Sequence, residues 1–129
     1  MTSKLQVDSL EGRTTKGSVV VMGESNGKTT NLQQGLAKCW AFFNGSGTIA
    51  ISDSFNCSGL TDDGTGDYDI DMTNVHANTN YSVSLVSGDY HCGHGGNEAA
   101  GKFNMESYNS SHASADMSRV HGQSFGDLA

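Results

Sequence analysis

Two short stretches of this sequence alternate strictly between apolar and polar side chains, namely residues 67–72 and residues 80–85. Their apolar members are Tyr68, Ile70, Met72, Tyr81, Val83 and Leu85, and their polar members are Asp67, Asp69, Asp71, Asn80, Ser82 and Ser84. A period of two places the two kinds of side chain on opposite faces of a β-strand, so each stretch predicts a strand with one buried face and one solvated face. The segment between them is too short for a parallel crossover, which predicts an antiparallel hairpin at the centre of the fold.

The chain after residue 37 repeats this pattern of short strands. Strand-like segments recur about every ten residues and are separated by turns rich in Gly and Asn, such as residues 44–47. These segments are residues 39–43, 48–55, 57–60, 103–108 and 117–128. We therefore predict an all-β fold, an antiparallel, jelly-roll-like β-sandwich, for a display domain of residues 38–129.

Residues 1–37 have too few apolar side chains to form a core of their own. Residues 18–22 predict a strand, and Asn31 can cap a short helix that contains Leu32 and Leu36 at helical spacing. The whole chain is only 35% hydrophobic and contains 17 Gly, so burial offsets little of the conformational entropy lost on folding. We predict that residues 1–37 are an attachment and oligomerisation segment that packs against other chains.

The acidic composition excludes several classes of partner. The formal net charge is −7, and no run of Lys or Arg could neutralise a phosphate backbone, so nucleic acid is not an expected partner. No apolar run approaches the roughly 20 residues of a membrane span, and the N-terminus lacks the apolar centre of a signal peptide. We expect synthesis in the cytoplasm, no membrane insertion, and unpaired thiols at Cys39, Cys57 and Cys92.

The segment His91-Cys-Gly-His94 is the most suggestive of chemistry. His and Cys suit zinc or iron, but ligands this close together match no recognised spacing, and a fourth would have to come from His112, His121 or another subunit. His91, Cys92 and His94 therefore remain alternatives to a prediction of no metal and no cofactor. A Cys92 nucleophile with His91 or His94 as base would give a hydrolase, but no orienting group or oxyanion donor is evident, so no catalytic residue is predicted.

Two further motifs match known sites incompletely. Residues 96–102 fit the first seven positions of a phosphate-binding loop, but Phe103 stands where the magnesium-binding Ser or Thr belongs. Asp67, Asp69 and Asp71 lack the Gly and the closing Glu of a calcium loop. The sequence therefore predicts neither a nucleotide site nor a calcium site, and the three aspartates are expected to form a solvated acidic face that discourages edge-to-edge aggregation.

Several segments carry a resemblance to a known class of proteins. They are residues 3–17, residues 31–38 (NLQQGLAK) followed by Trp40, residues 44–48 (NGSGT), 53–56 (DSFN), 58–68 (SGLTDDGTGDY) and 78–81 (NTNY), and more loosely residues 126–129. Together they resemble small virion proteins of tailed bacteriophages, especially tail-fibre and appendage proteins of marine phages. The resemblance implies a β-rich homotrimer on the virion surface, joined to other virion proteins of the tail or capsid through residues 1–37.

The resemblance also implies where host recognition would occur. The variable part of such proteins is the tip, which here corresponds to the loops of residues 87–102 and 109–115. The expected contacts with a host-surface glycan or an outer-membrane protein are exposed aromatic and amide side chains: Tyr90, Asn97, Tyr108 and Asn109. Two alternatives remain: a capsid decoration, head-fibre or tail-assembly protein without receptor binding, and the hydrolase that uses Cys92 with His91.

Overall fold

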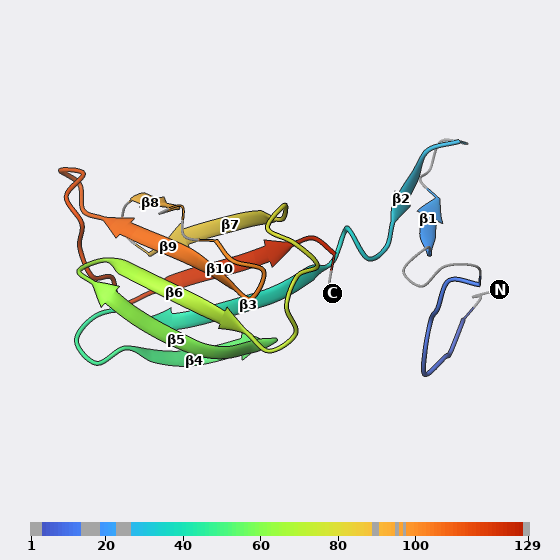
Figure 1. Cartoon of the computed structure of the whole chain (residues 1–129), viewed down its shortest axis with the longest axis horizontal. Coiled ribbons are helices and arrows are strands. Elements are labelled where there is room, and N and C mark those ends of the chain that lie inside the picture. Colours follow the sequence, from blue (N-terminus) through green and yellow to red (C-terminus); the bar gives the residue numbers. More distant parts are fainter. Residues whose placement is uncertain are drawn as a thin grey trace. The chain divides into compact units, whose positions relative to one another are not determined.

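The computed structural model describes residues 4–13, 19–22, 27–88, 91–94, 96 and 98–127. The chain divides into two compact units, Met1–Leu36 and Ala37–Ala129. The larger unit is an antiparallel β-sandwich (Figure 1), which confirms the predicted fold class. The described residues contain no helix, and hence none with the length and apolarity to cross a membrane.

The sandwich consists of two sheets of four strands each, and all strand pairs are antiparallel (Figure 1). The first, here called the β10 sheet, has the order β4 (Ala50–Phe55), β3 (Ala37–Asn44), β10 (Val120–Phe125) and β7 (Ser82–Ser87). The second, here called the β9 sheet, has the order β5 (Cys57–Gly64), β6 (Asp67–Met72), β9 (Lys102–Tyr108) and β8 (His91–Gly93). The sequence did not predict β8, because its short segment lies among glycines.

The hydrophobic core lies between the two sheets, where the inward-facing side chains of the strands meet. Its buried members are Cys39, Ala41, Phe43, Tyr68, Ile70, Met72, Phe103, Met105, Met117 and Val120. Val83 and Leu85 of β7 pack against this cluster. The buried faces predicted for residues 67–72 and 80–85 are therefore confirmed.

The predicted hairpin between these two stretches is wrong. β6 pairs with β5 and β9 in one sheet, whereas β7 pairs with β10 in the other. The connecting segment crosses between the sheets: the His76 N–H donates to Ala100 O at 2.8 Å and the Ala77 N–H to Asp127 O at 2.8 Å. Alternation specifies which face of a strand is buried, but it does not specify the neighbouring strand.

A single residue, Asn56, carries the chain from β4 in the β10 sheet to β5 in the β9 sheet. Its φ of 56° lies in the left-handed region, which asparagine tolerates better than most residues. Its amide nitrogen donates to Lys38 O at 2.9 Å and to Asn74 O at 2.8 Å, and its Oδ1 accepts from Asn74 N at 2.7 Å. This side chain therefore fixes the corner at which the strand changes sheet.

The centre of the β10 sheet is built from small residues on its inner face. Gly122 of β10 lies between Ala41 of β3 and Leu85 of β7. A Cβ atom at Gly122 would lie 2.7 Å from Ile70 Cδ1 and 2.9 Å from Phe103 Cε2, both closer than van der Waals contact. The missing side chain thus makes room for two large residues of the β9 sheet.

The acidic side of β6 is less solvated than expected. Asp69 is only 4% exposed, where the sequence predicted an open carboxylate. It forms an ion pair with Lys102 of β9, and the Asn104 amide donates to Asp69 Oδ1 at 3.2 Å and to Asp67 Oδ1 at 2.7 Å. The neighbouring strand supplies a cation and an amide that the alternation pattern alone did not reveal.

The N-terminal unit contains one antiparallel pair, β1 (Val20–Met22) with β2 (Thr29–Asn31). The predicted helix is wrong: residues 32–35 form a turn, in which Asn31 Oδ1 accepts from the Gln34 N–H at 3.1 Å. A single helical turn is costly to nucleate, and Gly35 weakens it further. The large apolar side chains that this unit leaves exposed are Leu5, Val7, Leu10, Val20, Val21, Met22 and Leu36.

Candidate functional site

The outer face of the β10 sheet carries aromatic side chains. On β3, Trp40 and Phe42 alternate with the buried Cys39, Ala41 and Phe43, so they point away from the core. Phe55 of β4 lies opposite Trp40 and is 55% exposed, and Val86 of β7 is 56% exposed. Apolar side chains thus occupy both faces of this sheet, although only its inner face packs against the core.

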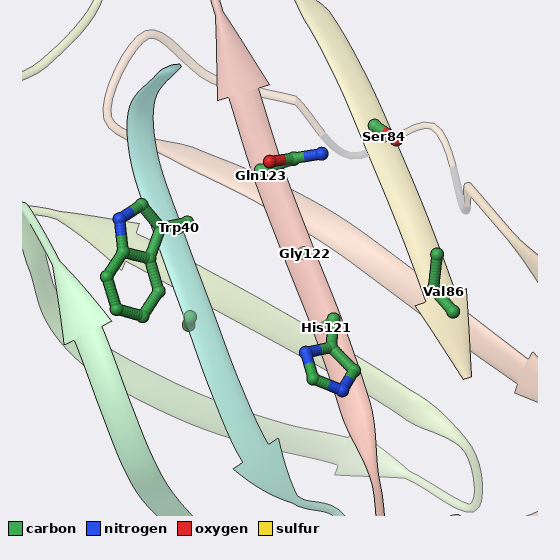
Figure 2. A pocket seen from close by; sticks show the side chains of 7 residues that line it. Trp40, Ser84, Val86, His121, Gly122 and Gln123 are labelled. Atoms are coloured by element: carbon green, nitrogen blue, oxygen red, sulfur yellow. The ribbon is translucent and has the colours of Figure 1, made fainter. Parts of the chain in front are cut away.

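A hollow of about 410 Å³ lies on this outer face, which is within the usual size range of small-molecule sites. Its lining, here called the Trp40 hollow, consists of Trp40, Ala41, Ser84, Val86, His121, Gly122 and Gln123. Figure 2 shows the side chains of Trp40, Ser84, Val86, His121 and Gln123 on the three strands, while Gly122 contributes only backbone to the lining.

The strand register places these side chains in two rows. Trp40, Gln123 and Ser84 lie side by side across β3, β10 and β7, and His121 lies beside Val86 in the next row. The rigid central strands therefore fix an indole, an amide and a hydroxyl at neighbouring positions.

The hollow combines apolar surface, from Trp40, Ala41 and Val86, with three polar side chains, those of Ser84, His121 and Gln123. The His121 ring stacks on Phe42 with a centroid distance of 4.4 Å and an interplanar angle of 5°, which orients it at the rim. Gln123 offers an amide donor and acceptor, Ser84 a hydroxyl, and Trp40 an indole N–H and an apolar ring face. None of the lining residues is Asp, Glu, Lys or Arg. The arrangement is suited to binding a neutral ligand.

Two of the four predicted receptor contacts can be placed in the structure, since Tyr90 and Asn97 lie outside the described residues. The Tyr108 hydroxyl donates to Glu106 Oε2, and this hydrogen bond raises the pKa of the phenol above its usual value. Asn109 Oδ1 accepts from two backbone N–H groups of its own loop, residues 109–113, at 2.9 and 3.1 Å. Both side chains organise their own segment, and their contact with a receptor stays a prediction.

The predicted metal-ligand candidates face different neighbours. The Cys92 thiol donates to Leu85 O at 3.0 Å, whereas His91 stacks on His112 at a centroid distance of 4.6 Å. The His94 Nε2 atom contacts the Glu98 carboxylate. Across the described ranges there is no group of three His, Cys, Asp or Glu side chains placed to hold a metal ion.

Described parts of the two predicted tip loops lie side by side. β8 pairs with β9 so that His91 is opposite Tyr108, and the His91–His112 stack joins residues 91–93 to the loop of residues 109–114. His112 has a φ of 59°, which helps to turn this loop back toward β8. The recognition role of this end of the sandwich stays a prediction.

The structure supplies no activated thiol at the buried cysteines. Cys39, Cys57 and Cys92 are all free thiols. Burial raises the pKa of Cys39 to about 12, and burial also raises the pKa of Cys57. A thiol with a raised pKa holds little of the reactive thiolate at neutral pH, and Cys39 lies in the core while Cys57 packs against it.

Sequence reasoning missed the Trp40 hollow, although one signal could have revealed it. Residues 39–43 (CWAFF) are apolar at every position, whereas a strand with one solvated face normally alternates with polar residues. The surplus aromatic side chains at Trp40 and Phe42 had to point outward. The partners from β7 and β10 could not be found without the pairing of the strands.

Comparisons of this chain with protein-family models, with curated proteins and with solved structures find no match. The resemblance to phage virion proteins therefore stays an expectation from the sequence. The function has to be inferred from the chain's own residues and geometry.

Proposed function

We propose that this chain is a structural protein on the surface of a bacteriophage particle, a tail fibre or appendage that displays a surface for host recognition. The observation that carries the proposal is the contrast between its two units. Among the residues that the structure describes, the N-terminal unit exposes seven large apolar side chains and none of its residues belongs to the core, whereas the larger unit encloses a hydrophobic core and exposes four. A unit that exposes most of its large apolar side chains is typical of one that another chain covers.

The attachment role falls to residues 1–37. Val20, Val21 and Met22 are each more than half exposed, although they lie in a β-strand whose apolar side chains normally pack against something. A depression of about 250 Å³ in the same unit is lined mainly by apolar residues, including Leu10, Leu32 and Leu36. Other virion proteins, or sister chains of a homotrimer, are the proposed partners of this unit.

A trimer would suit the display role of the sandwich. Linked copies of one weak site can raise the apparent affinity by roughly 10²–10⁴ over a single site. Modest affinity of each copy for a host-surface glycan or outer-membrane protein would then suffice for adsorption.

The same N-terminal unit also fits a capsid decoration, head-fibre or tail-assembly protein that binds no receptor. The hydrolase alternative receives less support, because Cys92 donates to the Leu85 carbonyl while His91 stacks on His112, so the two do not form a nucleophile and base pair. Receptor binding distinguishes a tail fibre or appendage that recognises the host from a decoration or assembly protein.

Two measurements on the phage that encodes the chain test the proposal. Antibodies against the full chain should label the surface of intact particles in electron microscopy, and excess purified chain should slow adsorption to the host. A triple variant with Val20, Val21 and Met22 replaced by Ser should still compete for host cells but should not be incorporated into particles. Absence of the chain from particles would refute the proposal, whereas labelling without competition would favour a decoration or assembly protein.

A further inference from the structure

We infer that the Trp40 hollow binds a short neutral saccharide, with one pyranose ring stacked on Trp40 and its hydroxyls bonded to Gln123, Ser84 and His121. This inference rests on the proposed function, because it names the ligand class that the displayed sandwich would recognise. It places the recognition site on the face of the β10 sheet and not on the loops of residues 87–102 and 109–115.

The ring of Trp40 provides the apolar half of such a site. Figure 2 shows the indole face-on, extending from β3 on the side away from β10 and Gly122, and Trp40 is partly exposed. A pyranose presents aliphatic C–H groups on the face of its ring, which suits the electron-rich face of an aromatic side chain. Because β3 and β10 are inner strands of their sheet, the indole sits on a rigid support and loses little freedom on binding.

Three polar side chains provide the other half. Gln123 and Ser84 continue the row that begins at Trp40, and neighbouring strands are about 4.8 Å apart, so the row extends about 10 Å across the sheet. Sugar hydroxyls project from the edge of the ring, each as both donor and acceptor. An amide, a hydroxyl and the His121 imidazole can satisfy both roles.

The charges around the hollow favour a neutral ligand over a charged one. Its lining lacks Lys and Arg, and the chain carries a net charge of −7, so a phosphate or sulfate group would meet no opposite charge except a protonated His121. The carboxylate of Asp53 lies opposite Phe42, outside the lining. A nucleotide could stack on Trp40 but would bring a phosphate that the site cannot neutralise.

An apolar partner fits the hollow less well. Ser84, His121 and Gln123 are all exposed at its surface, and an apolar side chain placed over them would leave their polar groups without hydrogen bonds. Contact between two copies of the chain through this face is the competing occupant, and the experiment below separates it from saccharide binding.

The single tryptophan of the chain makes the test direct, because all indole fluorescence comes from the hollow. The full chain is titrated with maltotriose, cellotriose, chitotriose, mannotriose and galactotriose. We expect a saturable change in the emission of Trp40 with at least one of them, at millimolar concentration. Calorimetry with that sugar should then show at least a tenfold loss of affinity in Gln123→Ala and no measurable binding in Trp40→Ala.

Two control variants keep the result interpretable. Thr61→Ala, exposed on the β9 sheet, should leave the affinity unchanged, and Trp40→Phe should retain part of it because a smaller ring still stacks. The inference is overturned if none of the five sugars gives a saturable response, or if calorimetry shows that binding survives both Gln123→Ala and Trp40→Ala. It is also overturned if sedimentation shows self-association that Trp40→Ala abolishes while the sugars have no effect. Labelling of particles is measured separately, so failure here leaves the virion role standing.

Discussion

Replacing Gly122 by alanine should destabilise the sandwich strongly for a single methyl group. The new Cβ would lie 2.7 Å from Ile70 Cδ1 and 2.9 Å from Phe103 Cε2. Both neighbours are 0% exposed, so neither can move aside into solvent. Overpacking of this kind typically costs about 1–3 kcal/mol, which corresponds to a fall in Tm of roughly 4–8 °C per kcal/mol for a domain of this size.

A double-mutant cycle identifies the cause. Ile70→Val removes the Cδ1 atom nearest the new methyl group and by itself should cost about 0.5–1.5 kcal/mol. In the Gly122→Ala background the same change relieves the clash, so the double variant should be more stable than the sum of the single effects by at least about 0.5 kcal/mol.

Urea unfolding monitored by Trp40 fluorescence and by circular dichroism gives the four free energies of unfolding that the cycle needs, for the parent chain, the two single variants and the double variant. Gln123→Ala, the next residue along β10 but facing outward, is the matched control and should change the stability by less than about 0.5 kcal/mol. If the effects of Gly122→Ala and Ile70→Val on the free energy of unfolding simply add, the two side chains are not in the close contact described. The same conclusion follows if Gly122→Ala destabilises the chain no more than the control does.

Three further changes test other parts of the fold. Asn56→Ala should cost about 1–3 kcal/mol in urea unfolding, since it loses the hydrogen bonds at the corner and strains a residue with a φ of 56°, and Asn56→Gly should cost less because only the hydrogen bonds are lost. His76 is 1% exposed, and burial lowers its pKa below 6.5, so the unfolded chain binds a proton at this residue before the folded chain does. The free energy of unfolding should therefore fall as the pH drops below about 6.5. His76→Gln should reduce this dependence on pH, and an unchanged dependence would contradict the burial of a neutral His76. Burial raises the pKa of Tyr68 to about 12, so stability should fall as the pH rises above about 10, where the unfolded chain ionises first. Burial also raises the pKa of Tyr81 to about 12, so spectrophotometric titration of Tyr68→Phe should show one strongly alkaline phenol fewer than the parent chain, and an unchanged alkaline end of the titration would contradict the burial of Tyr68.

The sandwich presents two chemically different outer faces. The outward side of β6 in the β9 sheet carries Asp67, Asp69 and Asp71, in part neutralised by Lys102, whereas the outward side of the β10 sheet carries Trp40 and other aromatic residues. A partner attracted to the second face would meet no carboxylate in the hollow itself. The division of acidic and aromatic side chains between the two sheets follows from which strands pair.

The individual strands could be predicted from the sequence. Strict alternation in residues 67–72 and 80–85 predicted both β6 and β7 with the correct buried faces, because the period of a strand is set by the geometry of the backbone alone. The turn at residues 44–47 was likewise predicted from its Asn and Gly residues, whose backbone preferences are local. Local chemistry was sufficient wherever the question concerned a single strand or turn.

Only the tertiary structure decided which strands are neighbours. Both β6 and β7 alternate, yet they lie in different sheets, because hydrogen bonds from His76 and Ala77 hold their connection to two separate segments. The Trp40 hollow depends on the same decision, since its indole, amide and hydroxyl come from three strands far apart in the sequence. The sequence determines the faces of each strand through local sterics, whereas the pairing depends on how whole faces fit together, as Gly122 fits against Ile70 and Phe103.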